Sequence, residues 1–140
     1  MSHFFKNNIC PNGFFLDNAA TYINGPLDPV IQGDFMVAES YDPYGMYPCN
    51  QNTEILTTGV NAQGFDSVFV YFDMDFDPFT TGNDTIQLWI NDGFQWWVED
   101  WTDQQESGSY GYNITQYATS TLLQVAWTYS GYNGNYCALD

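Results

Sequence analysis

The residues best suited to chemistry are three aspartates at alternate positions, Asp73, Asp75 and Asp77, within SVFVYFDMDFD. Alternate side chains of a strand share a face, so the Asp73 and Asp75 carboxylates are expected about 7 Å apart. Such close like charges repel unless a cation or a proton lies between them. Calcium takes hard oxygen ligands, which makes this segment a candidate calcium site, although it lacks the glycine and late glutamate of an EF-hand loop. The alternative is that these are solvated acids of a protein that is acidic throughout.

Paired carboxylates are also the machinery of glycoside hydrolysis, which needs two of them about 5–9 Å apart. Asp73/Asp75 and Glu99/Asp100 are the candidate pairs. Glu99 and Asp100 are adjacent on a predicted strand, so they are expected on opposite faces, which is wrong for a pair. Nucleophilic catalysis would need the single histidine, His3, which lies in an irregular leader. We therefore predict that the chain is not an enzyme and has no catalytic residues.

Aromatic side chains form the second candidate site, since the chain has five Trp, eleven Tyr and eleven Phe. Flat rings can stack on the C–H faces of sugars, while amide and carboxylate side chains bind the hydroxyl groups. The candidate ligand-binding residues are Trp96, Trp101 and Tyr110. Because Trp96 and Trp97 are adjacent, one of them must enter the core if they lie on a strand. The alternative for all of them is core or cross-strand packing.

The charge excludes several functions. The chain has 17 acidic residues, no Arg and one Lys, Lys6, which gives a formal net charge of −16. Nucleic-acid binding needs basic side chains to displace phosphate counterions, and binding to anionic lipid needs them too. No apolar window is long enough to insert into a membrane. Disorder is not expected, because 44% of the residues are hydrophobic and 19% aromatic.

Hydrophobic alternation predicts an all-β protein. The clearest strand is 67–76, in which alternate residues from Val68 to Phe76 share one face and the aspartates share the other. Asn91-Asp92-Gly93 is expected to turn a hairpin, and 41–53, 77–84 and 102–111 are expected to be loops. The other predicted strands are 35–38, 54–58, 85–91, 94–101, 122–129 and 136–140. This spacing favours an antiparallel two-sheet sandwich. We predict one domain, 1–140, with an irregular leader over 1–33 containing one or two short strands, and a body over 34–140.

Three cysteines, Cys10, Cys49 and Cys137, allow one disulfide and one free thiol. A Cys10–Cys49 bond would tie the leader to a mid-chain loop and leave Cys137 as a small apolar residue in a strand. Pairing of Cys137 with either of the other two is equally allowed by the sequence.

From residue 35 onward, seven short motifs follow one another. They are FMVAES (35–40), EILTT (54–58), SVFVYFDMDF (67–76), WINDGFQWW (89–97), NITQYA (113–118), QVAWTY (124–129) and YCALD (136–140). In this order they resemble the jelly-roll modules of large secreted bacterial proteins, of the cleaved-adhesin and choice-of-anchor J type. Those modules are related in fold to MAM domains and concanavalin A-like sandwiches. The resemblance covers roughly three-quarters of the chain, and no single motif is specific.

The resemblance implies a jelly roll with Trp97 in its core. It also implies a structural calcium near the chain ends, with Asp140 as a ligand and Asp34 or Glu39 as its partner. Together with the alternating acids, the candidate metal ligands are Asp34, Glu39, Asp73, Asp75 and Asp140. The sequence departs from the family pattern at Cys137, where an aromatic is usual, and in lacking a final hydrophobic strand after Asp140. A neighbouring chain that completes this edge would give self-assembly.

We therefore expect a noncatalytic extracellular module for adhesion or surface assembly, stabilised by calcium, with a glycan or a surface protein as its partner. The first alternative is a carbohydrate-binding module attached to an enzyme, and the second is a filament subunit completed by strand donation. The third is a hydrolase, which would need a cleft with two facing carboxylates.

Overall fold

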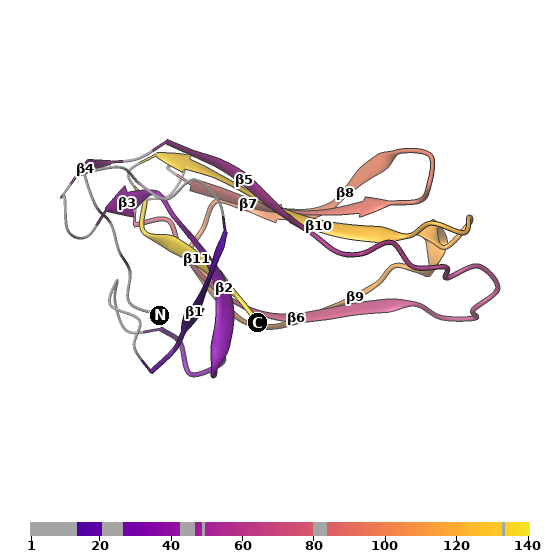
Figure 1. The fold of residues 1–140 in the computed structure, drawn as a ribbon, viewed down its shortest axis with the longest axis horizontal. Coiled ribbons are helices and arrows are strands. Elements are labelled where there is room, and N and C mark those ends of the chain that lie inside the picture. Colours follow the sequence, from indigo (N-terminus) through magenta and orange to yellow (C-terminus); the bar gives the residue numbers. More distant parts are fainter. Residues whose placement is uncertain (1–13, 21–26, 43–46, 49, 80–83, 133) are drawn as a thin grey trace.

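The computed structural model describes residues 14–20, 27–42, 47–48, 50–79, 84–132 and 134–140. Across these residues the chain is almost entirely extended (Figure 1). The strands are β1 (Phe15–Asn18), β2 (Asp34–Glu39), β3 (Tyr41–Asp42), β4 (Tyr47–Pro48), β5 (Asn50–Leu56), β6 (Phe69–Asp77), β7 (Asp84–Asn91), β8 (Trp96–Thr102), β9 (Glu106–Asn113), β10 (Gln124–Tyr132) and β11 (Tyr136–Leu139). One turn of 3-10 helix, η1 (Thr115–Tyr117), follows β9. None of the helical structure described is long and apolar enough to cross a membrane.

Two antiparallel sheets stack on each other, which confirms the predicted two-sheet sandwich. One has the strand order β1-β2-β11-β6-β9 and the other β5-β10-β7-β8. Figure 1 shows them as two layers, with the long β6–β9 pair facing β10 and β7. β8 and β9 are the edge strands of their sheets and follow one another in the chain. Their outer sides therefore form one open flank of the sandwich.

The alternation predicted for β6 decides which of its side chains enter the core. Met74 and Phe76 are buried between the sheets, where Phe76 packs beside Ile86 and Tyr129. A second cluster toward the other end includes Ile90, Ile114 and Val125. Trp127 packs against both clusters and so joins them. The three aspartates lie on the opposite face of β6, as the sequence predicts.

The outer face of the five-stranded sheet has a small core of its own. Val37, Tyr136 and Ala138 are covered there by residues 27–31, including Ile31 at 3% exposure. Because both faces of β11 are covered, all four of its residues are buried. Cys137 on the inner face is a free thiol, which removes the two disulfide pairings that include it. Cys10 and Cys49 lie outside the described residues, so their pairing stays a prediction.

Two segments predicted to be loops contain strands. Residues 102–111 include most of β9, which pairs with β6 from Phe69↔Asn113 to Phe76↔Glu106. Residues 41–53 include β3, β4 and the start of β5. β1 lies within residues 1–33, the predicted leader. The predicted hairpin is confirmed: β7 pairs with β8, and Gly93 takes a φ of 91° in the turn between them.

A buried carboxylate at the start of β7 links the two sheets. Asp84 is 0% exposed. It accepts hydrogen bonds from the Tyr129 hydroxyl of β10, the Ser40 hydroxyl 2.7 Å away and the Tyr132 amide 3.0 Å away. A Cβ at Gly131 or Gly134 would overlap the carboxylate, so both positions need glycine. No sequence pattern points to this cluster, because its members are spread from residue 40 to residue 134.

Candidate functional site

The outer face of the four-stranded sheet carries three cross-strand rows of side chains. The first row is Gln124, Asn91 and Trp96, the second is Leu56, Ala126, Trp89 and Val98, and the third is Glu54, Thr128, Gln87 and Trp101. Directly paired residues point to the same side of a sheet, and neighbouring rows lie about 7 Å apart. We call this surface the tryptophan face.

Hydrogen bonds fix the polar middle of the tryptophan face. The Trp89 indole N–H donates to Gln87 Oε1 and to Thr128 Oγ1, both at 3.1 Å. Asn91 donates to Gln124 Oε1 at 3.2 Å. These bonds hold side chains of two neighbouring strands, β7 and β10, in one layer, so the face is a rigid surface with amide and hydroxyl groups at its centre.

The apolar rim of the tryptophan face is open to solvent. Trp96 is 41% exposed, Val98 44% and Trp101 59%. The two indoles are four residues apart along the partner strand, from Asn91 to Gln87, or about 13 Å. The structure thus places two of the three predicted ligand-binding residues on one exposed surface.

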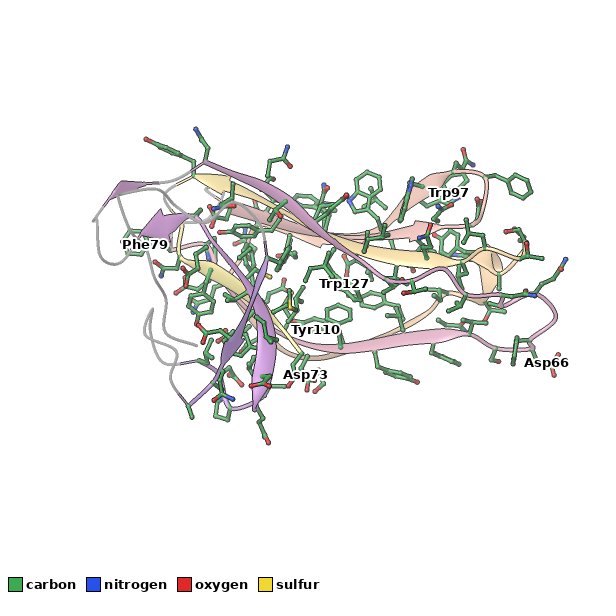
Figure 2. The ribbon with its side chains drawn as sticks, viewed as in Figure 1. Asp66, Asp73, Phe79, Trp97, Tyr110 and Trp127 are labelled. Atoms are coloured by element: carbon green, nitrogen blue, oxygen red, sulfur yellow. The ribbon has the colours of Figure 1, made fainter. Side chains whose placement is uncertain are left out.

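Trp97 does not enter the core as expected. It is 43% exposed, and its indole N–H donates to Asp92 Oδ2 at 2.8 Å in the hairpin turn. This bond, together with the Gln95 and Phe94 amides, holds the pKa of Asp92 below its ordinary value. Trp97 pairs with Ile90 near the tip of the hairpin, where the sandwich opens (Figure 2). The Trp97 side chain therefore points toward the other sheet but stays accessible to solvent, because it lies at the end of the sandwich.

Tyr110, the third predicted ligand-binding residue, lies between the sheets rather than on the tryptophan face. Figure 2 shows it in the space between the two layers, as it does Trp127. Its ring stacks on Phe72 with centroids 5.4 Å apart, and its hydroxyl donates to Glu106 Oε2 at 3.3 Å. Burial, with the Glu106 charge, raises the pKa of Tyr110 to about 12, so it is a hydrogen-bond donor at neutral pH.

Tyr110 belongs to a pocket on the open flank between β8 and β9. The cavity has a volume of about 60 Å³. Its lining residues are Phe72, Met74, Ile86, Leu88, Asp100, Trp101, Thr102, Glu106, Tyr110, Tyr112 and Trp127. Apolar side chains of both sheets form the floor, and two carboxylates belong to the edge strands. We call this the flank pocket.

A β-bulge changes the expected placement of Glu99 and Asp100. The register of β7 and β8 shifts between Leu88 and Trp89, so that Leu88 pairs with Asp100 and Trp89 with Val98. The extra residue, Glu99, interrupts the alternation. Both carboxylates therefore accept hydrogen bonds from tyrosines beyond their own sheet, Glu99 from Tyr117 at 2.6 Å and Asp100 from Tyr112 at 2.5 Å. The expectation that they point to opposite faces is wrong.

The aspartates of β6 lie on the outer face of the five-stranded sheet, and Figure 2 shows Asp73 outside that layer. Asp75 is 5% exposed. Its Oδ2 accepts the Asp28 amide at 2.7 Å and the Tyr136 hydroxyl at 2.9 Å. Burial raises the pKa of Asp75 in spite of these two bonds. Asp75 is thus stabilised by two neutral donors, one from the segment that covers this face and one from β11.

The five predicted metal ligands do not form one coordination shell. Asp140 exchanges two backbone hydrogen bonds with Asp73, at 2.9 and 3.0 Å. Glu39 is buried and pairs with Tyr136. Asp34 lies five residues before Glu39 on β2, so its side chain points to the opposite face of the sheet. It accepts a hydrogen bond from Asn18. Among the described residues there is no group of three or more His, Cys, Asp or Glu side chains that could hold a metal ion.

The predicted C-terminal edge corresponds to one side of β6, which has no described partner beyond the end of β11, although β11 itself is the central strand of its sheet. β11 pairs with β6 only as far as Leu139↔Met74, and Asp140 adds the bond to Asp73. Residues 69–72 of β6 have a described partner only in β9. Self-assembly through this edge stays a prediction.

No family model and no curated protein matches the sequence. A search of solved structures finds the K1 cleaved adhesin domain of Lys-gingipain from Porphyromonas gingivalis W83. The match has a TM-score of 0.60 at 9% sequence identity, and it covers 92% of this chain and 80% of that one. At this identity the likeness concerns the fold: the chain shares the β-sandwich architecture of a cleaved adhesin domain.

Proposed function

We propose that this protein is a noncatalytic extracellular adhesion module that binds its partner through the tryptophan face. The observation that carries the proposal is the pair of exposed indoles, Trp96 and Trp101, on one rigid face of a sandwich whose fold is similar to an adhesin domain. Exposed tryptophans beside a fixed polar surface are typical of protein-binding sites, where Trp and Tyr supply much of the binding energy. The large negative charge keeps such a module soluble, and salt screens its self-repulsion.

The contact surface is tested by removing both indoles. The double variant Trp96→Ala/Trp101→Ala is expected to bind immobilised extracellular proteins at least about 30-fold more weakly than the wild type, because the loss of even one hot-spot residue costs about 2 kcal/mol or more. Surface plasmon resonance over a panel of extracellular proteins and glycans measures this. The control is Phe65→Ala/Phe79→Ala, which removes two rings exposed at 66% and 71% that lie outside this face. Equal loss in both variants, or binding that neither changes, would contradict the proposal.

Carbohydrate binding is the second candidate function, and the middle of the tryptophan face favours it. Gln87, Thr128 and Asn91 place amide and hydroxyl groups between indoles that could stack on sugar rings. The same panel separates the two candidates. Saturable binding to a glycan that disappears in Trp96→Ala supports a carbohydrate-binding module, and binding to proteins alone supports adhesion to protein.

Calcium stabilisation belongs to this proposal as a prediction. A cation that binds only the folded state raises the melting temperature. We therefore expect EGTA to lower the melting temperature, and added calcium to restore it. An unchanged temperature would remove calcium from the proposal and leave the adhesion function untouched, because the tryptophan face contains no predicted metal ligand.

A further inference from the structure

The flank pocket contains two carboxylates whose hydrogen-bond donors among the described residues are all neutral. Asp100 accepts the Tyr112 hydroxyl and the Trp101 amide, at 2.5 and 2.8 Å. Glu106 accepts the Thr102 hydroxyl at 2.9 Å and the Tyr110 hydroxyl at 3.3 Å. An ionised carboxylate has about four acceptor positions, so each still has room for a further donor.

The described residues cannot supply a cation to this pocket. They contain no Lys, Arg or His, since the two basic candidates of the chain, His3 and Lys6, lie outside them. The formal net charge of −16 adds a long-range attraction for any positive group that approaches. The counter-charge for Asp100 and Glu106 is therefore expected from outside.

The rest of the lining favours an organic cation over a hydrated metal ion. The floor is apolar, with Met74, Ile86 and Leu88. A hydrated metal ion gains nothing from such a floor, whereas the methylene stem of a long basic side chain does. This lining favours a guanidinium over an ammonium, because the aromatic residues Trp101, Tyr110 and Tyr112 belong to it and a planar guanidinium stacks on aromatic rings.

The size of the cavity limits the occupant to the end of a side chain. An engineered apolar cavity of about 150 Å³ binds benzene. The flank pocket, at about 60 Å³, is too small for a sugar ring. It has room for about two waters, and the Trp127 Nε1 atom, which is buried and finds no acceptor among the described residues, calls for one of them.

We propose that the flank pocket binds an arginine side chain of a partner protein, with the guanidinium between Asp100 and Glu106 and its stem on the apolar floor. This inference rests on the proposed function, because it supplies the protein partner. The pocket lies beside the tryptophan face, and Trp101 belongs to both. A partner seated on that face therefore needs only one arginine at its edge to reach the carboxylates.

The experiment uses a small probe that needs no partner. N-acetyl-arginine-N′-methylamide is titrated into the protein, with tryptophan fluorescence and ¹H–¹⁵N NMR as readouts, and the neutral citrulline analogue is the comparison. We expect saturable binding of the arginine probe, with shifts at Trp101 and Trp127, and at least tenfold weaker binding of citrulline. Asp100→Asn/Glu106→Gln keeps the shape of both side chains and should weaken arginine binding at least tenfold.

The matched control is Asp34→Asn/Asp66→Asn, which removes two charges from exposed positions outside both the pocket and the tryptophan face and should bind within twofold of the wild type. Equal weakening in both double variants would mean attraction by net charge alone and would overturn the proposal. Equal binding of citrulline, or no saturation with arginine, would overturn it too. Trp96→Ala, which is remote from the pocket, should leave arginine binding intact, so failure of the adhesion proposal and failure of this one are told apart.

Discussion

Asp84→Ala is expected to lower the free energy of unfolding by about 3 kcal/mol or more, and the melting temperature by about 10 °C. The substitution removes the acceptor from three groups that converge on it, the Tyr129 and Ser40 hydroxyls and the Tyr132 amide. Hydrogen bonds to a charged group are worth about 1.5–3 kcal/mol, and each donor left buried without a partner adds a further cost. The expected loss is a large share of the total stability of a domain of this size.

The cost of Asp84→Ala should also depend on pH. Burial raises the pKa of Asp84 above its ordinary value of 3.8, against the hydrogen bonds, which lower it. A carboxyl group with a raised pKa contributes stability that is complete below pH 3.8 and is lost as the pH rises through the raised value. The difference between wild type and variant should therefore be larger at pH 5 than at pH 8.

Thermal melts followed by circular dichroism at both pH values measure these effects. Asp66→Ala is the control, because Asp66 is exposed at the right-hand end of the molecule in Figure 2 and the change in charge is the same. It should change the melting temperature little at either pH. If the two variants melt alike, Asp84 is not the buried acceptor that joins the sheets.

The sequence predicts the strands whose side chains alternate between core and solvent, and it misses those whose pairing comes from elsewhere. β9 reads ESGSYGYN, and glycine and serine disfavour strands. It is a strand because it lies beside β6, and its small residues have a role there: a Cβ on Gly111 would lie 2.7 Å from the Tyr71 ring. The alternation of Tyr110 and Tyr112 is the local signal that points to this strand.

The candidate site, too, could be predicted from the sequence only in part. Trp96 and Trp101 could be named because both lie on a predicted strand, and Trp96 is expected to be exposed if its neighbour Trp97 enters the core. Trp97 is in fact exposed as well. The face that Trp96 and Trp101 share could not be named, because five residues separate them and a strict alternation would put them on opposite faces. The β-bulge at Glu99 restores the shared face, and it also brings Asp100 to the flank pocket. One inserted residue thus builds both surfaces, and a bulge of this kind leaves no mark in the sequence pattern.

Phe76→Ala is expected to cost about 3–5 kcal/mol, which is the usual range for removing a buried aromatic ring. Phe76 is 0% exposed between the sheets, and its ring meets that of Tyr129 edge-on with centroids 6.4 Å apart. The cavity left behind cannot collapse easily, because hydrogen-bonded strands hold both walls. The melting temperature should fall by about 10–20 °C. Phe76→Leu leaves a smaller cavity, so its melting temperature should lie between those of Phe76→Ala and the wild type.

The matched control lies on the same strand. Phe69→Ala makes the identical substitution seven residues earlier in β6. An odd number of residues puts Phe69 on the opposite face of the strand, where it is 49% exposed and stacks on Tyr71. It should cost about 1 kcal/mol or less, because half of the ring already contacts water. Urea unfolding of the three variants and the wild type, with circular dichroism as the readout, compares them directly. If Phe69→Ala cost as much as Phe76→Ala, the assignment of the two faces of β6 would be wrong, and with it the placement of Asp73 and Asp75 outside the sandwich.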